Sequence, residues 1–296
     1  MFDQAQNREH ISYKHQIYRS FLYCSGVNLN HFYKACETNT DAISIDLEDT
    51  VPIQLKAQAR QDTCSLIREN LNKHNKPLFV KINPISSKYG VTDLESLSEY
   101  SIAGIRVPKV NDTREVEIIN SILDNTAFKG CIQLMIETAP GVLNMKDISF
   151  SSKYTSALIV GERDLSHHLG CDLNEIGYVL SLAVICSRAA NLLPPILCGD
   201  PILDIEKNSV RSLNGKRKGF WGQLCVHPSQ IDIVNELFTP SADEIICAKN
   251  VITMLEESER QGKTAIRNTD GNYISVWALD RANRVLALAD AVSKLQ

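Results

Sequence analysis

Two acidic residues near the middle of the sequence have the chemistry of a site for a hard metal ion. Glu137 ends the apolar run 132–136, and Asp164 closely follows the apolar run 156–161. If these runs are adjacent parallel strands, both carboxylates lie at the same edge of the sheet. Mg²⁺ prefers oxygen ligands and is usually held by one or two carboxylates together with water. The pair therefore predicts a Mg²⁺ site, at which Mn²⁺ is an alternative ion.

The acidic residues also have structural interpretations. Glu137 could be an acid near the start of a helix, where it interacts favourably with the helix dipole. Asp164 could cap the helix that follows it. Glu48 and Asp49, in the segment "DLEDT", could take part in the site or could simply precede a helix that begins near Pro52. The residue types alone do not decide between these roles.

Eight short apolar runs alternate with helical patterns along the chain. The runs are rich in Ile, Val, Leu and aromatic residues, and Pro, Gly, Asn or Asp bounds most of them, as is typical of strands. Their continuous apolar character indicates parallel strands covered on both faces. Helices are predicted at 52–71, 112–124 and 228–238. The predicted strands are 17–24, 42–47, 78–83, 102–108, 132–137, 156–161, 195–199 and 223–226.

This order of elements predicts an α/β fold, a (β/α)8 TIM barrel with a C-terminal helical arm. An open doubly wound sheet is the alternative, but no GxGxxG motif follows the first strand. Residues 1–261 are predicted to form the barrel domain, and residues 262–296 the arm or lid. Because TIM-barrel sites lie at the carboxyl ends of the strands, the polar residues there become candidates. Besides the acids, they include Lys81, Asn83, Arg106 and Lys109.

Composition excludes several classes of partner. The chain has 296 residues, a formal net charge of −4 and 22% charged residues, so neither nucleic acid nor an anionic membrane is expected as a partner. No apolar stretch reaches the ~20 residues of a membrane span, and the first residues are polar rather than signal-like. The nine cysteines show no zinc-binding spacing. We therefore expect reduced thiols in a cytoplasmic protein.

Several segments in order resemble a known family. They include "RSFLYCSG", "DAISIDLEDTV", "VKINP", "GIRVPKV", "LMIETAPGVLN", "GERDLSHHLG" and "GFWGQLCVHPSQIDIVNELFTPSADEI". Together they resemble the citrate lyase beta-subunit-like branch of the HpcH/HpaI aldolase superfamily, from about residue 18 to residue 292. The resemblance implies a TIM barrel assembled as a homotrimer or homohexamer. It also implies Mg²⁺ bound by Glu137 and Asp164.

The resemblance implies a carbon–carbon lyase. The expected reaction cleaves a 3-hydroxyacyl thioester, such as malyl-, citramalyl- or citryl-CoA, into a 2-oxoacid and acetyl-CoA, or forms the thioester from them. The family usually has Arg where this chain has Lys81, and Lys keeps the charge but loses the planar fork. Lys81 and Arg19 are expected to bind the acyl carboxylate or stabilise an enolate. Lys109 matches the family's "PK" as a further substrate-binding candidate.

The roles of several residues stay open at this level. Glu48 and Asp49 are expected to support the site or to transfer protons. Arg19 could instead form a salt bridge with one of these acids. Ser275 stands at a tail position where some relatives have an acid. Together with Lys81, it keeps open a metal-dependent aldolase acting on a 2-oxoacid without CoA, or a non-catalytic homologue.

Overall fold

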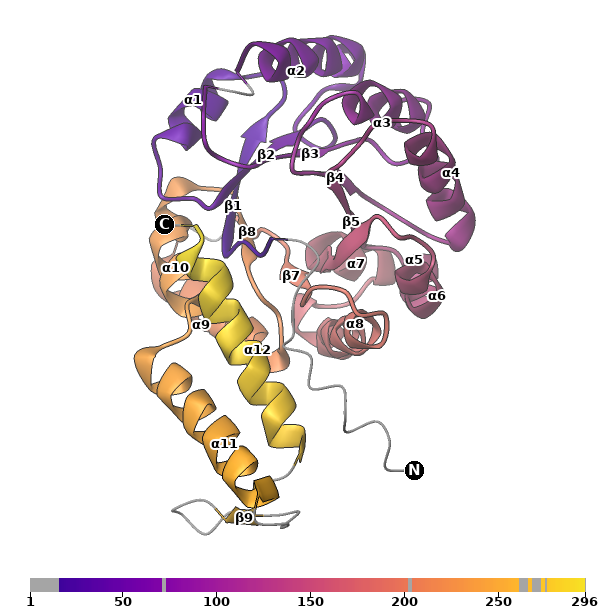
Figure 1. Ribbon diagram of the computed structural model, residues 1–296. Coiled ribbons are helices and arrows are strands. Elements are labelled where there is room, and N and C mark those ends of the chain that lie inside the picture. Colours follow the sequence, from indigo (N-terminus) through magenta and orange to yellow (C-terminus); the bar gives the residue numbers. More distant parts are fainter. Residues whose placement is uncertain are drawn as a thin grey trace. The chain divides into compact units, whose positions relative to one another are not determined.

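Eight parallel strands close into a barrel in the computed structural model (Figure 1). Each strand pairs in parallel with the next, and β8 pairs with β1 to complete the ring. The predicted (β/α)8 barrel is therefore confirmed. The strands are β1 (Ser20–Ser25), β2 (Ala42–Asp46), β3 (Leu78–Lys81), β4 (Gly104–Val107), β5 (Cys131–Ile136), β6 (Thr155–Val160), β7 (Ile196–Leu197) and β8 (Gln223–Cys225).

Helices connect the strands and surround the barrel (Figure 1). The helix predicted from residue 112 begins at Thr113, because the Asp112 side chain accepts hydrogen bonds from the backbone N–H groups of Arg114 and Glu115. The helices are α1 (Asn30–Cys36), α2 (Lys56–Asn70), α3 (Gly90–Ser98), α4 (Thr113–Asp124), α5 (Ala139–Leu143), α6 (Met145–Phe150), α7 (Glu162–Leu169), α8 (Gly177–Ala189), α9 (Ile205–Lys218) and α10 (Ile231–Phe238). Short 3₁₀ turns precede α2 and α10, at Ile53–Leu55 and Pro228–Gln230.

The strands are buried on both faces, which explains their continuous apolar sequences. Helices cover the outer face, and the inner face points into the barrel. Phe21 of β1 and Phe79 of β3 pack edge to face at 5.2 Å between ring centroids. Their strands are not paired with each other, so the two rings meet across the barrel interior. Arg106 of β4 lies over both rings.

The structure describes residues 16–70, 73–201, 204–260, 266–267, 273–274 and 276–295. By contacts, the chain divides into one unit of residues 18–238 and another made of residues 1–17 and 239–296. The second unit contains α11 (Ala242–Arg260), α12 (Val276–Ser293) and an antiparallel pair, β9 (Ile266–Arg267) with β10 (Tyr273–Ile274). The predicted boundary at 261/262 and Ser275 lie outside the described residues, and both stay predictions.

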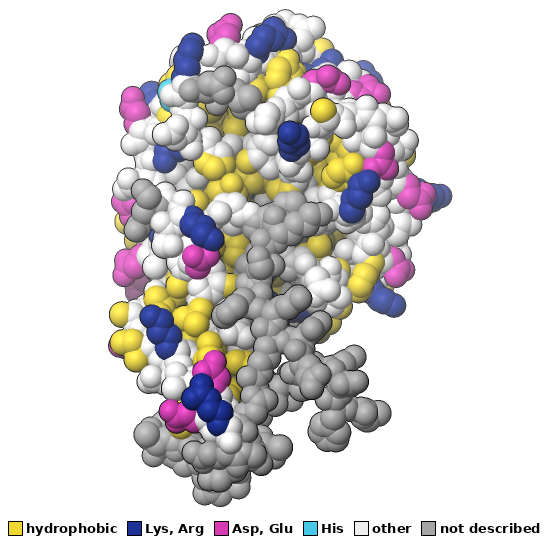
Figure 2. Space-filling model, viewed as in Figure 1, with side chains coloured by type: hydrophobic (Ala, Val, Ile, Leu, Met, Phe, Trp, Pro, Cys, Tyr) yellow, Lys and Arg dark blue, Asp and Glu magenta, His cyan; other side chains and the backbone are white. Residues whose placement is uncertain are grey.

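The distribution of surface charge and the apolar character of the helices can be compared with the partners excluded from the sequence, nucleic acid and membranes. On the face in Figure 2, acidic and basic side chains are interspersed and neither sign gathers into one patch. No single described helix is long and apolar enough to cross a bilayer. The residues Glu162–Leu169 and Leu173–Ala189 pass that test only together, as a pair bent by 108°.

Candidate active site

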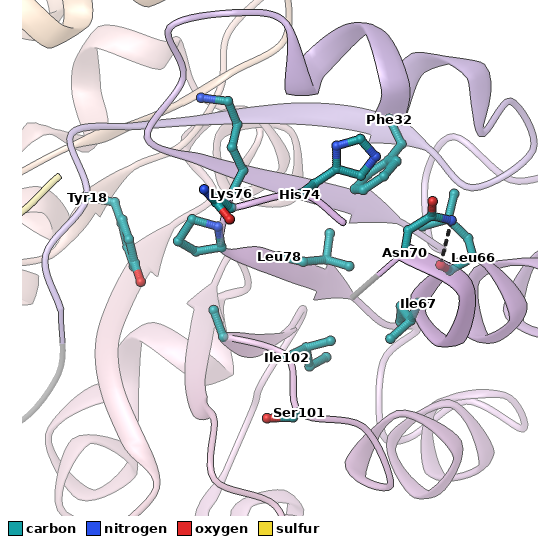
Figure 3. A pocket seen from close by; sticks show the side chains of 13 residues that line it. Tyr18, Phe32, Leu66, Ile67, Asn70, His74, Lys76, Leu78, Ser101 and Ile102 are labelled. Carbon is teal, nitrogen blue, oxygen red and sulfur yellow. Dashed lines mark hydrogen bonds between the residues drawn. The ribbon is translucent and has the colours of Figure 1, made fainter. Parts of the chain in front are cut away.

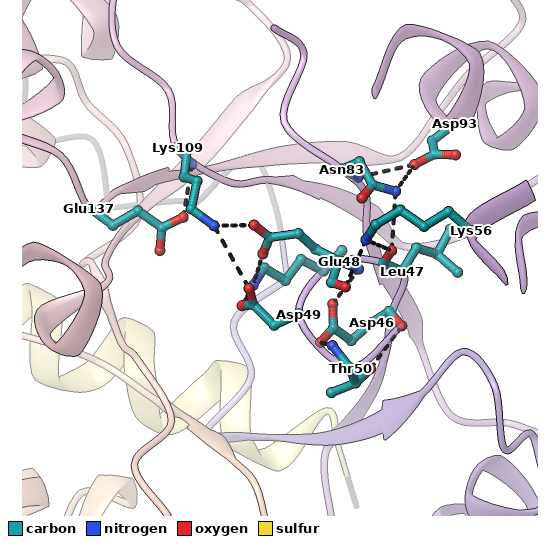
Figure 4. Close-up of polar contacts among 11 residues, drawn as sticks. Asp46, Leu47, Glu48, Asp49, Thr50, Lys56, Asn83, Asp93, Lys109 and Glu137 are labelled. Carbon is teal, nitrogen blue, oxygen red and sulfur yellow. Dashed lines mark hydrogen bonds and ion pairs between the residues drawn. The ribbon is translucent and has the colours of Figure 1, made fainter. Parts of the chain in front are cut away.

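Two lysines and two carboxylates form a closed charge network at the carboxyl ends of β2, β3 and β4 (Figure 4). Lys81 Nζ lies 2.5 Å from Glu48 Oε2 and 2.7 Å from Asp49 Oδ2. Lys109 Nζ pairs with Glu48 Oε1 and lies 3.7 Å from Asp49 Oδ1. The structure therefore brings together four of the residues predicted from the sequence, and each lysine bridges the same two acids.

Burial sets the charge balance of this network. Burial raises the pKa of Glu48, although Lys81 lowers it in part. Burial also opposes the charge of Lys81, but the surrounding acidic groups outweigh it, and the pKa of that ammonium lies well above its usual value. Asp49 is more exposed. Burial raises its pKa, but Lys81, a hydrogen bond with Glu48 and the charge of Lys109 together outweigh burial, and the pKa falls to about 2. Lys81 is thus a permanent cation, and Glu48 is the acid of the network that protonates most easily.

The loop that carries Glu48 and Asp49 is held from several sides. Asp46 accepts hydrogen bonds from the backbone N–H groups of Glu48 and Thr50, which closes the turn after β2. Lys56 of α2 donates to the carbonyl oxygens of Leu47 and Glu48 at 3.2 and 2.9 Å. These contacts fix the position from which the two carboxylates reach the lysines (Figure 4).

A second set of bonds ties this loop to the end of β3. Asn83 donates to the Leu47 carbonyl oxygen at 3.1 Å and to Asp93 Oδ2 at 2.7 Å. Asp93 is buried and also pairs with Arg60 at 3.0 Å. Lys56, Asp93 and Arg60 were not singled out from the sequence. Lys56 and Arg60 lie on α2 and Asp93 on α3, and no local signal distinguishes them from ordinary helix residues.

Glu137 follows β5 and turns its carboxylate toward this network. Its Oε1 accepts the backbone N–H of Lys109 at 2.9 Å. Its side chain also passes directly over Gly161, where an added Cβ would lie 2.3 Å from Glu137 Oε2. The following helix, α5, is capped by Thr138, whose hydroxyl accepts from Gly141 N. The structural alternative, in which Glu137 serves the helix start, is therefore not what the fold shows.

Asp164 lies in the first turn of α7, and Gly161 rather than Asp164 occupies the cap position. The two charged residues that precede it in the same turn, Glu162 and Arg163, already have ion-pair partners. Glu162 binds Arg211, and Arg163 binds Asp200. The described contacts include no hydrogen bond or ion pair of the Asp164 carboxylate, which leaves it available to a ligand.

Glu137 and Asp164 together fit a bound Mg²⁺. The pKa of Glu137 is raised to about 7, chiefly by burial, with Glu48 and Asp164 adding to the rise and Lys81 opposing it. The mutual effect of two acids shows excess negative charge that a cation would relieve. Within the described part of the chain, no cluster of three or more His, Cys, Asp or Glu residues forms a full ligand set. Two carboxylates suit an ion that keeps waters or takes substrate oxygens.

Arg19 lies at the other end of the barrel. It precedes β1, and its guanidinium binds Asp41, which precedes β2, through Nε at 2.8 Å and Nη2 at 2.7 Å. The predicted contact with a substrate does not fit this position, because the site residues follow the strands rather than precede them. The alternative salt bridge is formed, but with Asp41 instead of Glu48 or Asp49.

A cavity of about 520 Å³ also lies at the amino ends of the strands (Figure 3). Pro77 and Leu78 at the start of β3, and Ile102 and Ala103 before β4, form part of its wall. None of the predicted catalytic, substrate-binding or metal-binding residues lines it. Since barrel enzymes place their chemistry at the opposite face, we do not assign the reaction to this cavity.

The protein therefore has a TIM-barrel fold with carboxylates and lysines at the carboxyl ends of its strands, where TIM-barrel enzymes place their active sites. Residues 19–228 match the family model described as HpcH/HpaI aldolase/citrate lyase. Because the match covers more than half of the chain, the protein belongs to this family. The resemblance expected from the sequence is confirmed, and so is the expected class, a carbon–carbon lyase of the citrate lyase beta-subunit type.

The relatives found by sequence cover nearly the whole chain. A (3S)-malyl-CoA thioesterase of Cereibacter sphaeroides is 29% identical over 93% of this chain and 96% of its own. The citrate lyase subunit beta of Haemophilus influenzae is 26% identical over 92% and 96%. Among solved structures, CitE of Mycobacterium tuberculosis in complex with magnesium, acetoacetate and coenzyme A superimposes with a TM-score of 0.73 at 22% identity, covering 93% of this chain and 98% of that one.

Proposed function

We propose that this protein is a Mg²⁺-dependent lyase that cleaves, or forms, a 3-hydroxyacyl thioester such as malyl-, citramalyl- or citryl-CoA. The products of cleavage are a 2-oxoacid and acetyl-CoA. The observation that carries the proposal is the Glu137 carboxylate, which lies between the Lys81 and Lys109 network on one side and Asp164, close enough to raise its pKa, on the other. Family membership and the names of the relatives support the same reaction class.

Glu137 and Asp164 would hold the metal ion, and the remaining positions would be open to substrate oxygens. Bound there, Mg²⁺ supplies positive charge next to the hydroxyl and carboxylate of the acyl group. Lys81 is buried and remains charged, so it presents a fixed cation to negative charge that develops on the substrate. Such preorganised charge is usually a large contribution to catalysis.

The chain also provides a proton acceptor. The pKa of Glu48 is raised by burial, so this carboxylate can take the proton of the substrate hydroxyl at neutral pH. As the O–H bond breaks, the oxygen electrons form the carbonyl of the 2-oxoacid. The C–C bond then breaks, and its electron pair passes to the acetyl thioester as an enolate. Glu48 then returns the proton to the enolate carbon, which completes acetyl-CoA and regenerates the carboxylate.

The test is product analysis with the purified protein, Mg²⁺ and a panel of malyl-, citramalyl- and citryl-CoA. Mass spectrometry should detect acetyl-CoA and the matching 2-oxoacid from one of them. Glu137→Gln should abolish the reaction, and EDTA should do the same. Asp124→Asn is a matched control, because the described contacts of Asp124 are an exposed ion pair with Lys153 and a hydrogen bond with Tyr154, both away from the site.

A second candidate is hydrolysis of the thioester. It is favoured by the relatives named (3S)-malyl-CoA thioesterase, which are 28–29% identical to this chain. The same assay separates the two reactions, because hydrolysis of malyl-CoA gives malate and free CoA. Release of free CoA without acetyl-CoA would replace the lyase proposal with a thioesterase.

Metal binding and turnover together separate the lyase from an aldolase without CoA and from a non-catalytic homologue. Mg²⁺ binding without turnover of any CoA ester would favour an aldolase that acts on a 2-oxoacid without CoA. The absence of Mg²⁺ binding by calorimetry would favour a non-catalytic homologue.

The assembly and location belong to the same proposal, a homotrimer or homohexamer in the cytoplasm. Large apolar side chains are exposed on neighbouring helices α5, α6 and α8, namely Leu143, Phe150, Tyr178 and Ile185, which supports association. All nine cysteines are free, which is consistent with a reducing compartment. Light scattering coupled to gel filtration would measure the number of subunits, and a monomeric mass would overturn the assembly.

A further inference from the structure

Arg106 is a fully buried arginine inside the barrel. Its side chain is 0% exposed, and its Nε donates to Gln133 Oε1 at 2.7 Å. The guanidinium lies 4.4 Å from the ring centroid of Phe21 and 5.0 Å from that of Phe79. The aromatic faces are its principal neighbours, and they attract a cation through their quadrupoles.

No carboxylate balances this charge among its described contacts. Both terminal nitrogens of Arg106 are buried without a hydrogen-bond partner. The Tyr23 ring lies 5.9 Å away and its phenol interacts with the guanidinium, but a phenol is neutral. Burial lowers the pKa of Arg106, yet an arginine remains protonated at neutral pH. A lone buried charge of this kind is costly to the fold.

The interior of a TIM barrel is usually filled by branched aliphatic side chains, which carry no such cost. An apolar side chain of similar length would fill the same space without that cost. Replacing a buried charge with an apolar residue is often neutral or stabilising. A function that needs the charge would explain why an arginine occupies this position.

The position of Arg106 points to that function. Arg106 and Lys81 are partners in the parallel register of β4 and β3, so their side chains leave the same face of the sheet, into the barrel. Like charges on neighbouring strands repel each other. Lys81 extends to Glu48 and Asp49 at the carboxyl end of the barrel, whereas Arg106 stays among the aromatic rings.

We propose that Arg106 is a positioning residue: its charge beneath the site holds the Lys81 ammonium at the mouth and favours binding of a substrate carboxylate there. This inference rests on the proposed function, because it concerns the anionic substrate of the same site. Arg106 touches no reacting atom in this account. It acts through Lys81 and through the field that two neighbouring cations create.

Calorimetry with oxaloacetate in the presence of Mg²⁺ tests the inference without requiring turnover. Arg106→Met removes the charge and keeps an unbranched side chain, and Arg106→Lys keeps the charge. Ser44→Ala is the matched control, because Ser44 Oγ is also buried in β2 without a partner but carries no charge. Thermal unfolding of each variant is measured beside its affinity.

The expected result is a separation of stability from affinity. Arg106→Met should unfold at or above the wild-type temperature and bind oxaloacetate at least about tenfold more weakly. Arg106→Lys should restore most of the affinity, and Ser44→Ala should leave affinity unchanged. An Arg106→Met protein that loses thermal stability but keeps wild-type affinity would overturn the inference, and so would a wild-type protein that binds no 2-oxoacid. Wild-type binding without cleavage of any CoA ester would count against the proposed lyase alone, since the affinity comparison remains decisive for Arg106.

Discussion

Lys109 contacts acids of the site through both its backbone and its side chain. Its backbone N–H donates to Glu137 Oε1 at 2.9 Å, and its Nζ pairs with Glu48 and Asp49. Lys109 does so from a left-handed conformation with φ of 52°, which is uncommon for a residue with a side chain. Such conformations cost free energy and persist where the surroundings impose them. The backbone of Lys109 orients the predicted metal ligand, and its side chain joins that ligand to the charge network.

The two roles of Lys109 can be separated by substitution. Lys109→Gly removes the side chain but accepts the left-handed backbone, so Mg²⁺ affinity should stay close to wild type while catalysis falls. Lys109→Ala removes the same ammonium and keeps the backbone strain, so it should be less stable than Lys109→Gly by about 1 kcal/mol. Urea denaturation and Mg²⁺ calorimetry measure both quantities. Equal stability of the two variants would contradict the assignment of strain.

Gly161 is predicted to be essential for the metal site. A Cβ there would meet Glu137 Oε2 at 2.3 Å, so Gly161→Ala should displace that carboxylate and weaken Mg²⁺ binding at least tenfold. Gly170→Ala is the control at the other end of α7. Gly170 has φ of 67° and open space around its Cα, so its substitution should cost stability without changing Mg²⁺ affinity. Equal Mg²⁺ affinities of Gly161→Ala and wild type would contradict the geometry.

Glu137 should destabilise the metal-free protein at alkaline pH. Its pKa in the fold is about 7, above its ordinary value of 4.5, so the folded state binds the proton more tightly than the unfolded state. The stability that this provides below pH 4.5 is lost as the pH rises through 7. Glu137→Gln cannot lose this proton. In EDTA, its free energy of unfolding minus that of the wild type should therefore be about 2 kcal/mol higher at pH 8 than at pH 5. A gain that does not depend on pH would contradict the raised pKa.

Lys81 should be required for stability as well as for function. Lys81→Met leaves the buried Glu48 with one of its two cationic partners and should cost about 3 kcal/mol of unfolding free energy. Adding Glu48→Gln should recover part of that loss, because the unpaired charge is then gone. A double variant as unstable as the sum of the two single variants would show that the pair is not coupled. Lys81→Arg, which keeps the charge, tests the geometry separately.

The barrel and most of the site were predictable from the sequence for physical reasons. Continuous apolar runs mark strands covered on both faces, and residues that end such runs gather at one end of a parallel barrel. That logic places Glu137, Glu48, Lys81 and Lys109 together. Arg19 was assigned to the substrate from the family resemblance and not from this logic, and the structure places it ahead of β1, which begins at Ser20.

Other features depend on contacts that local sequence does not encode. The support of the acidic loop by Lys56 comes from a helix residue that looks like any exposed lysine. The need for Gly161 follows from the path of a side chain on the neighbouring strand. Arg106 ended an apolar run like the other candidates, and only the structure shows that it remains inside the barrel.

The most direct test of the account is the balance of products from one CoA ester. The purified protein is incubated with Mg²⁺ and malyl-, citramalyl- or citryl-CoA, and acetyl-CoA, the 2-oxoacid and free CoA are quantified together. The account predicts that acetyl-CoA and the 2-oxoacid appear in equal amounts from one ester, and that Glu137→Gln forms neither. Wild-type protein that binds Mg²⁺ but releases no acetyl-CoA from any of the three esters would contradict it.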